Sequence, residues 1–286
     1  MFLVTGATGT NGSEIVKQLS AVGVKVRALV RNLAKAEAIA QPGVEIVEGD
    51  FSQPETLKTA LQGVEKALLL PPFDSRMVEW QSNFIEAAKH SGIKHIVKFS
   101  ALGADQNSPV SLLKWHGQGE KQIEESGISF THLRPNGFMQ NFLTLAPSIT
   151  TQGVFYQPAD NAKISHVDVR DIVAVAVKSL TEDGHEGKVY TITGPQALTF
   201  DEIALQLTAL IGKQVKYINV SPTDFQRTLL DFGQPEWLIN ALTELFEFYR
   251  SGQGSIVTNV VAEITNQQPI SFEQFIKDYA QVFLDH

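Results

Sequence analysis

Short apolar runs alternate with amphipathic segments along the first half of the chain. The runs that have the length and composition of β-strands span residues 2–5, 24–30, 44–48, 66–70, 95–99 and 128–133. Between them, apolar positions recur at helical spacing, as at Ile15, Leu19 and Val22. Strands with continuous apolar runs are typical of a parallel sheet that helices cover on both faces. The alternation therefore predicts an α/β fold built on a Rossmann-type doubly wound parallel sheet.

The alternation becomes less regular after about residue 150. Two further strands are expected over residues 164–169 and 188–193, and helices over 200–212 and 235–250. Thr199 with Glu202 has the spacing of a capping box at a helix start, and Ser271 with Gln274 has it again before the last helix. The long helix over 235–250 is very apolar, which is typical of a core or a domain interface.

The length of 286 residues indicates roughly two domains. We expect a Rossmann domain over residues 1–150 and a smaller, mainly helical C-terminal α/β domain over 151–286. Some segments of the second domain could rejoin the first.

Composition limits the classes of function. The chain is 43% hydrophobic and 19% charged, as in an ordinary globular protein, and its net charge of −8 argues against a nucleic-acid partner. Membrane association is not expected, since no apolar run approaches the roughly 18 residues of a membrane helix. The absence of cysteine excludes disulfides, thiolate zinc sites and a cysteine nucleophile, and it suits a reducing compartment. A strand already begins at Phe2, so we expect no signal peptide and a cytoplasmic location.

The first predicted strand runs directly into a glycine-rich turn, TGATGTNG, and then into a predicted helix. Such a turn presents backbone N–H groups and the positive end of a helix to a pyrophosphate. Its position inside a strand–helix–strand unit makes the signal strong. The alternative is a glycine-rich turn that binds nothing. The candidate cofactor contacts here are Gly6, Ala7, Thr8, Gly9, Thr10, Asn11 and Gly12.

The end of the second predicted strand indicates which dinucleotide is bound. A fold selective for NAD carries a carboxylate there for the ribose 2′-hydroxyl, but this chain has Arg31 and Asn32. A guanidinium can hold a 2′-phosphate with two parallel hydrogen bonds, and Lys35 can add a second positive charge. The sequence therefore favours NADPH over NADH. The alternative is that Arg31 is a solvated charge at the end of a strand.

Further candidates follow the other predicted strands. Ligands of open α/β sheets bind outside the carboxyl ends of the strands. Asp50 and Phe51 follow the third strand, where an adenine would lie. The remaining candidates at strand ends are Leu70, Pro71, Pro72, Ser100 and Ala101.

Several segments resemble the atypical short-chain dehydrogenases of the NmrA-like group over nearly the whole chain. Besides the glycine turn and the Arg31 position, they are GDF at 49–51, SALGA at 100–104, GISFTHLRPNGFMQNF at 127–142, HVDVRDIVAVAV at 166–177 and YTITGPQALTFDEIA at 190–204. The resemblance is strongest to bacterial NADPH-dependent quinone reductases and triphenylmethane dye reductases. The same group includes NmrA-type regulators, which bind dinucleotide and partner proteins without turnover.

The acid–base pair of ordinary short-chain dehydrogenases is missing. Those enzymes use a tyrosine with a lysine four residues later, and no tyrosine of this chain has one. The resemblance places His116 at the position of that lysine and Leu112 at that of the tyrosine. It implies that His116 contacts the nicotinamide ribose without transferring a proton. The alternative is a polar side chain of a first helical turn that faces water. Glu120, one turn later, could orient the imidazole.

The segment PNGFMQN follows the sixth predicted strand, where the family closes over nicotinamide. The candidates for that contact and for the substrate pocket are Phe138, Met139, Gln140 and Asn141. His166, Asp168 and Asp171 lie close in sequence, but their family segment is structural, so no metal is expected.

Together these features predict an NADPH-dependent reductase that transfers hydride to a small, hydrophobic, electron-poor acceptor such as a quinone. Residues 1–150 would then bind NADP, and residues 151–286 would lie on the substrate side. The alternative is a non-catalytic, NADP-sensing regulator of the NmrA type.

Overall fold

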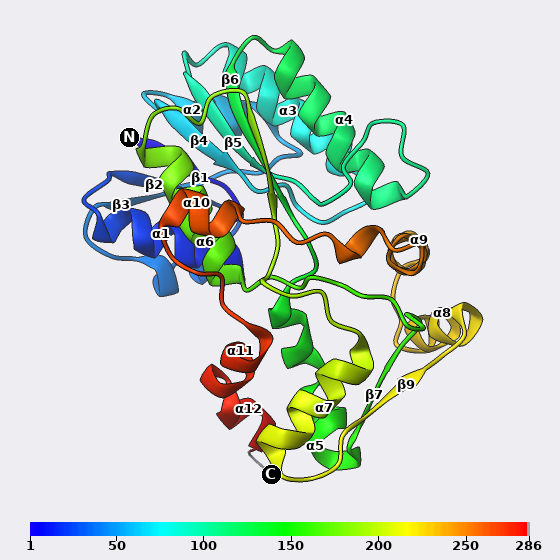
Figure 1. Ribbon diagram of the computed structural model, residues 1–286. Coiled ribbons are helices and arrows are strands. Elements are labelled where there is room, and N and C mark those ends of the chain that lie inside the picture. The colour runs from blue at the N-terminus through cyan, green and yellow to red at the C-terminus, as the bar shows by residue number, and fades with distance from the viewer. Residues whose placement is uncertain (285–286) are drawn as a thin grey trace. The chain divides into compact units, whose positions relative to one another are not determined.

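The computed structural model describes residues 1–284, and the chain divides into two compact units (Figure 1). Unit 1 comprises residues 1–109, 113–134 and 172–190. Unit 2 comprises residues 110–112, 135–171 and 191–286. The sequence placed a domain boundary at residue 150. In the structure the chain leaves unit 1 after Arg134 and returns to it over residues 172–190.

A seven-stranded sheet forms the centre of unit 1, in the order β3-β2-β1-β4-β5-β6-β8. Its strands are β1 (Phe2–Val4), β2 (Val26–Val30), β3 (Val44–Glu48), β4 (Lys66–Leu69), β5 (His95–Phe99), β6 (Ser129–Pro135) and β8 (Lys188–Ile192). The paired strands from β1 to β6 run parallel. The order 3-2-1-4-5-6 is that of a dinucleotide-binding Rossmann sheet. The predicted α/β class and doubly wound sheet are therefore confirmed.

Helices follow the strands along the chain, and each of them buries an apolar stripe. They are α1 (Thr10–Ala21), α2 (Pro54–Leu61), α3 (Met77–Lys89), α4 (Ser111–Glu125) and α6 (Val169–Thr181), with short 3₁₀ helices η1 (Leu33–Lys35) and η2 (Glu37–Ile39). Helix α1 buries Ile15, Val16 and Leu19, two of them at the spacing that predicted the helix. The core of unit 1 joins residues of β1, β4 and β5 to apolar side chains of α2 and α3.

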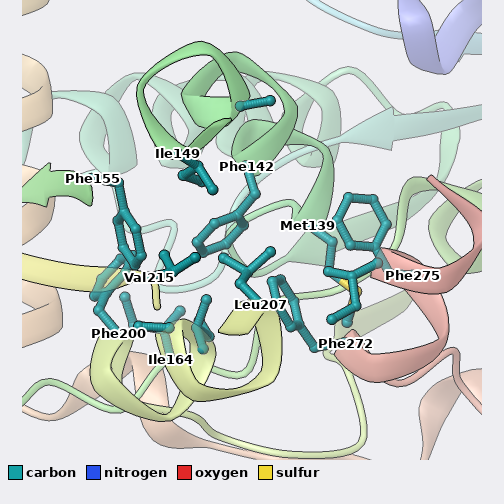
Figure 2. Close-up of a cluster of buried hydrophobic side chains, with 14 of the residues drawn as sticks. Met139, Phe142, Ile149, Phe155, Ile164, Phe200, Leu207, Val215, Phe272 and Phe275 are labelled. Carbon is teal, nitrogen blue, oxygen red and sulfur yellow. The ribbon is translucent and has the colours of Figure 1, made fainter. Parts of the chain in front are cut away.

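Unit 2 contains a two-stranded parallel sheet, β7-β9, and most of the remaining helices. Its elements are η3 (Met139–Leu145), α5 (Ala146–Gln152), β7 (Val154–Gln157), α7 (Phe200–Ile211), β9 (Lys216–Asn219), α8 (Pro222–Asp231), α9 (Glu236–Arg250), η4 (Gln253–Ser255), α10 (Val260–Thr265), α11 (Phe272–Asp278) and α12 (Ala280–Leu284). Aromatic rings dominate its core (Figure 2). Phe142 makes edge-on contacts with Phe155 and Phe272 at centroid distances of 6.3 and 5.0 Å.

One predicted strand, residues 164–169, is wrong. Ile164 and Val167 form only isolated bridges, to Leu198 and Phe138, and α6 begins at Val169. The strand cannot continue because Asp168 Oδ1 accepts a hydrogen bond from the Arg170 N–H, which satisfies a backbone group at the helix start.

The predicted capping boxes differ in outcome. Thr199 and Glu202 form the complete box at the start of α7. Ser271 accepts a hydrogen bond from the Gln274 N–H at the start of α11, and no reciprocal bond is found among the described residues. Helix α11 is followed by α12, so it is not the last helix.

Among the residues that the structure describes, no helix is long and apolar enough to cross a membrane.

Candidate functional site

The glycine turn after β1 leaves the start of α1 open to a ligand. Gly6 has a φ of +62°, and the Gly9 N–H donates to the Gly6 carbonyl at 3.0 Å. A Cβ on Gly12 would lie 2.2 Å from the Gly6 carbonyl oxygen, so only glycine lets the helix lie this close to the strand. Within the described chain, α1 has no side-chain cap and no acidic residue in its first turn. The turn therefore presents free N–H groups and a positive helix end, which fit a pyrophosphate.

An unpartnered polar atom lies in the same turn. Asn11 Oδ1 is buried and has no hydrogen-bond partner among the described residues. Buried acceptors without a partner are rare and costly in folded proteins. A ligand that carries hydroxyl donors, as a dinucleotide does on its riboses, can satisfy this oxygen. The residues present therefore fit the predicted cofactor.

The ends of β2 and β3 bring Arg31 and Asp50 into electrostatic contact. Burial favours the neutral form of Asp50, but hydrogen bonds from Ser52 and the charges of Arg31 and Arg76 outweigh it and lower its pKa. Arg31 and Lys35 are both exposed, so they are free to meet a phosphate. The structure thus places a guanidinium at the strand end where the sequence predicted it.

Phe51 is buried, whereas the preceding residue, Asp50, is half-buried. Its ring is 4% exposed and stacks on Phe84 with the centroids 5.8 Å apart. The sequence placed Asp50 and Phe51 at the edge and face of an adenine. Because the Phe51 ring belongs to the core of unit 1, a contact of Phe51 with adenine would have to use its backbone.

The ends of β4 and β5 carry the remaining predicted contacts of unit 1. The Leu70 N–H donates to Thr5 Oγ1 at 2.9 Å, and Pro71 is buried whereas Pro72 and Ala101 are half-buried. Ser100 is 6% exposed, and its hydroxyl donates to Glu120.

A lysine that the sequence analysis missed lies inside unit 1. Lys98 of β5 has no exposed surface, and its Nζ donates to the Phe99 carbonyl at 3.3 Å and contacts His116 Nδ1 at 3.1 Å. Burial, opposed by the nearby Glu120 carboxylate, lowers its pKa to about 7. The available signal was a lysine inside HIVKF, a run already predicted to be buried on both faces.

His116 is buried and does not face water, so that alternative is wrong. Burial and the neighbouring Lys98 hold its pKa well below the usual value, so the imidazole is neutral. The expected pairing with Glu120 is also wrong. Glu120 instead binds the guanidinium of Arg134 and the hydroxyl of Ser100. The imidazole of His116 contacts the Lys98 amine. Whether His116 contacts a nicotinamide ribose stays a prediction.

The segment after β6 contributes to unit 2. Met139 is 2% exposed and belongs to the core, and Phe138 is half-buried. Gln140 accepts from the Val169 N–H and donates to Asp168 Oδ1, so its amide supports the start of α6. Asn141 is exposed and lines the cavity described below. Of the four predicted nicotinamide contacts, two therefore have structural roles in unit 2.

Asp168 and Asp171 are occupied by protein partners. Asp168 binds Arg170, and Asp171 accepts a hydrogen bond from the Ile270 N–H. Among the residues described, no group of three or more His, Cys, Asp or Glu side chains could hold a metal ion.

Unit 2 contains a cavity of about 690 Å³, within the usual range for small-molecule sites. Its lining is mostly aromatic and aliphatic and comes from η3, α5, β7, α7, α8 and α9 and from the segments between them. The apolar side chains of the lining include Phe142, Leu145, Phe200, Phe225, Leu229, Phe232, Leu242, Leu245 and Phe246. A flat apolar ligand matches such a lining by stacking and hydrophobic burial.

Comparisons with known proteins agree with this arrangement. The chain is 38% identical to the NAD(P)H azoreductase of Xenophilus azovorans over 283 residues, which is 99% of each chain. The NADPH-dependent quinone oxidoreductase of Escherichia coli, crystallised with NADPH, is 33% identical, with a TM-score of 0.91 and coverage of 98% of this chain and 100% of that one. The triphenylmethane reductase of Citrobacter sp., complexed with NADP(H), is 29% identical, with a TM-score of 0.87 and coverage of 97% and 99%.

The glycine turn, the strand order and these similarities all agree with one assignment. The NmrA-like family model matches residues 1–276, so this protein belongs to the NmrA-like family.

Proposed function

We propose that this protein is an NAD(P)H-dependent reductase that transfers hydride to an electron-poor aromatic acceptor such as a quinone. The observation that carries the proposal is the apolar cavity of unit 2, which has the size and lining for a flat aromatic ligand. The glycine turn of unit 1 fits the cofactor that such a reaction needs. Three similar proteins support the same reaction class. They are an NAD(P)H azoreductase, a quinone oxidoreductase and a triphenylmethane reductase.

The residues of the chain bind and orient, and they leave the redox chemistry to the cofactor. A bound nicotinamide would supply the hydride. The free N–H groups at the start of α1 would hold its pyrophosphate, and Arg31 would hold the far end of the dinucleotide. The apolar wall of the cavity excludes water from the acceptor. Holding two reactants in place in this way removes much of the entropic barrier to their reaction.

The missing tyrosine–lysine pair is consistent with this acceptor class. A quinone that accepts hydride becomes a hydroquinone anion, which is stable enough to take its proton from water. A ketone or aldehyde would become an alkoxide and would need an acid in the protein. We therefore expect no oxidation of simple alcohols with NADP⁺.

A regulator without turnover is the less favoured alternative. It would bind dinucleotide in the same turn but would have no need of a large apolar cavity. The similarity to the reductases named above extends over almost their whole length, which also favours an enzyme.

NADPH oxidation by the purified protein tests the proposal. Quinones, an azo dye, a cationic triphenylmethane dye and a simple ketone are offered in turn, and absorbance of the reduced nicotinamide is followed. We expect turnover with quinones and none with the ketone. If no acceptor supports oxidation of NADPH or NADH, the proposal is wrong and the regulator without turnover becomes the favoured alternative.

The preference for NADPH over NADH is a separate part of the proposal and depends on Arg31. In Arg31→Ala, charge-assisted hydrogen bonds of roughly 1.5–3 kcal/mol are lost. At about 1.4 kcal/mol per factor of ten, NADPH affinity should fall on the order of ten- to a hundredfold. Lys35 should partly compensate, which favours the lower end. NADH has no 2′-phosphate, so its affinity should hardly change.

Fluorescence titration of both cofactors measures the two affinities in each variant. Arg227→Ala is a matched control, because it removes an exposed arginine of α8 that pairs only with Asp224 among the described residues. Equal losses of NADH and NADPH affinity in Arg31→Ala would show that Arg31 serves the fold and not the phosphate.

A further inference from the structure

The cavity of unit 2 has two deeply buried polar side chains in its wall. His166 is 9% exposed and Tyr249 is 8% exposed. The other polar residues of the lining are exposed or half-buried. The hydroxyls of Thr144 and Thr228 donate to carbonyls of their own helices, and the Ser148 hydroxyl donates to the Leu145 carbonyl just before α5. His166 and Tyr249 are thus the polar groups that a ligand deep in the cavity would meet.

The Tyr249 hydroxyl and His166 Nε2 are the polar atoms of these side chains that lie nearest Gly137. No hydrogen bond of either atom to the protein is found among the described residues, whereas the Ile164 backbone interacts with the His166 ring. His166 Nδ1 is a different atom of that ring and is not the one that faces Gly137. A ligand oxygen in the cavity can complete the hydrogen bonds of the hydroxyl and of Nε2.

The two groups converge on one point, above the backbone of Gly137. A Cβ built on this glycine would lie 3.3 Å from the Tyr249 hydroxyl and 3.5 Å from His166 Nε2. It would also lie 3.1 Å from His166 Cδ2, which is closer than most real Cβ contacts. Any residue other than glycine would therefore fill the space in which the two polar atoms face each other.

The aromatic surroundings fix the His166 ring in place. Phe142 and Phe200 contact it edge-on, with centroid distances of 5.1 and 5.8 Å. Both phenylalanines are labelled in Figure 2 and also line the cavity. The polar point is therefore enclosed by rings, as expected for a site that binds one polar atom of an aromatic ligand.

Both groups are uncharged near neutral pH. Burial lowers the pKa of His166 to about 4, and burial raises the pKa of Tyr249 far above its usual value. Tyr249 therefore offers an O–H donor. Neutral His166 can offer Nε2 either as a donor or as an acceptor, depending on its tautomer. Together they can give two donors to a carbonyl oxygen, or one donor and one acceptor to a phenolic hydroxyl.

The charge of the lining selects among acceptors. Of the residues the structure describes, those that line the cavity include no Asp, Glu, Lys or Arg. A cationic dye would find no counter-charge there, and burying an unpaired charge is costly. A neutral ring with a carbonyl oxygen meets neither difficulty.

We propose that Tyr249 and His166 form an oxygen-binding point above Gly137, which selects neutral aromatic rings that carry a carbonyl or hydroxyl group. Within the proposed reductase function, on which this inference rests, the ligands are a quinone before reduction and its hydroquinone afterwards. The pair accommodates both because the His166 tautomer can change with the ligand. Tyr249 and His166 are specificity-determining residues of this cavity.

Binding without cofactor tests the inference separately from turnover. The probes are 1-naphthol and naphthalene, which differ by one hydroxyl, and their affinities are measured by fluorescence titration. Wild type should prefer 1-naphthol. Tyr249→Phe should lose roughly three- to tenfold in 1-naphthol affinity, as expected for one neutral hydrogen bond, and keep its naphthalene affinity. With 1,4-naphthoquinone as acceptor, the same variant should raise KM more than it changes kcat.

Two further variants complete the test. Gly137→Ala adds a methyl group 3.3 Å from the Tyr249 hydroxyl and 3.5 Å from His166 Nε2, which narrows the approach to both atoms, so it should reduce the preference for 1-naphthol while Tyr249 is intact. Tyr279→Phe is the matched control, since it removes a hydroxyl from the same unit but outside the cavity lining. Thermal melts establish that each variant is folded.

An unchanged preference for 1-naphthol in Tyr249→Phe overturns the inference, whatever the enzyme reduces. A different result separates the two proposals. If no quinone supports NADPH oxidation but Tyr249→Phe abolishes the preference for 1-naphthol, the proposed function is overturned and the oxygen-binding point remains. Reduction of the cationic dye with a lower KM than any quinone also contradicts the selection argued here.

Discussion

Lys98 is a charged side chain that the fold removes completely from water. A lysine with no exposed surface keeps its charge only if partners replace water. Its contacts are the imidazole of His116 and the Phe99 carbonyl, while Glu120 attracts and Arg134 repels its charge. Burial outweighs these interactions and lowers the pKa of Lys98 to about 7, so near neutral pH the amine is protonated only in part.

This lowered pKa gives a pH dependence of stability that Lys98→Met should remove. Between about pH 7 and 10.5 the unfolded chain holds a proton on Lys98 that the folded protein has released. The free energy of unfolding therefore rises with pH in this window, by about 1.4 kcal/mol per pH unit at most. Urea unfolding across the window should show this rise in wild type relative to Lys98→Met.

The exposed Lys114 on α4 provides the control. Lys114→Met should leave the pH dependence as it is in wild type. Parallel curves for wild type and Lys98→Met would mean that the Lys98 amine remains fully charged in the folded protein.

The limits of sequence reasoning are clearest at this scale. The apolar run HIVKF predicted a buried strand, and β5 has those bounds, but burial of a strand does not reveal which polar groups meet inside. Lys98 meets His116 only because β5 and α4 are neighbours in unit 1. The same applies to Tyr249 and His166, because Tyr249 lies in α9 and His166 lies in the segment between β7 and α6. Such pairs are products of packing and leave no local signal.

Elements were more predictable, because period and turn chemistry are local. The strands β3 and β5 have the predicted bounds, and the glycine turn precedes α1 as expected. Residues 164–169 mislead because they are buried without pairing as a strand. Ile164 and Val167 form only isolated bridges, so the segment has no continuous strand neighbours. The apolar residues therefore indicated a buried segment correctly and its secondary structure wrongly.

Gly12→Ala tests the close contact between α1 and the turn. The added Cβ would meet the Gly6 carbonyl oxygen at 2.2 Å and the Ala7 Cα at 2.9 Å, both of them backbone atoms that cannot rotate away. Helix α1 must shift, which should cost roughly 1–3 kcal/mol of stability and move the N–H groups of the turn. We expect a lower melting temperature and a loss of affinity for NADPH and NADH alike.

Ser13→Ala is the matched control on the same helix. Its hydroxyl donates only to the Thr10 carbonyl among the described residues, so the melting temperature and both affinities should stay near wild type. Wild-type cofactor affinity in Gly12→Ala would show that the turn does not depend on the close helix contact. The equal loss of both cofactors distinguishes this variant from Arg31→Ala, which should spare NADH.

At the scale of the whole molecule, the boundaries of the two units were the least predictable feature. The sequence allowed some later segments to rejoin the first domain but did not indicate which ones. The sequence changes character near residue 150, but unit 1 ends at Arg134 and regains residues 172–190. The return is made through α6 and β8, and β8 adds to the edge of the sheet next to β6. A strand at a sheet edge can come from any distance along the chain, since its partner is set by the sheet and not by sequence proximity.

Buried histidines in both units should make the whole protein sensitive to acid. Burial lowers the pKa of His95, His132 and His166 to about 4, and it lowers that of His116 well below its usual value. Between pH 6.5 and about 4 the unfolded chain binds protons on these side chains that the folded protein does not. The free energy of unfolding must therefore fall as pH falls through this range. Asp171 acts in the opposite sense, because burial raises its pKa to about 6 and its stabilising proton is gained as pH falls.

The histidines outnumber Asp171, so the net effect should be acid destabilisation that begins near pH 6.5, well above the usual pKa of carboxylates. His132→Phe isolates one contribution, since the ring stacks on Phe130 at 4.4 Å. Neither nitrogen has a hydrogen-bond partner among the described residues, although Glu124 Oε1 lies 3.5 Å from Nε2. The variant should retain the stacking, and the slope of its unfolding free energy below pH 6.5 should be smaller by up to about 1.4 kcal/mol per pH unit. Urea unfolding at intervals between about pH 4 and pH 7 measures both slopes. Identical slopes for wild type and variant would show that His132 is protonated in the folded protein and that burial does not control its charge.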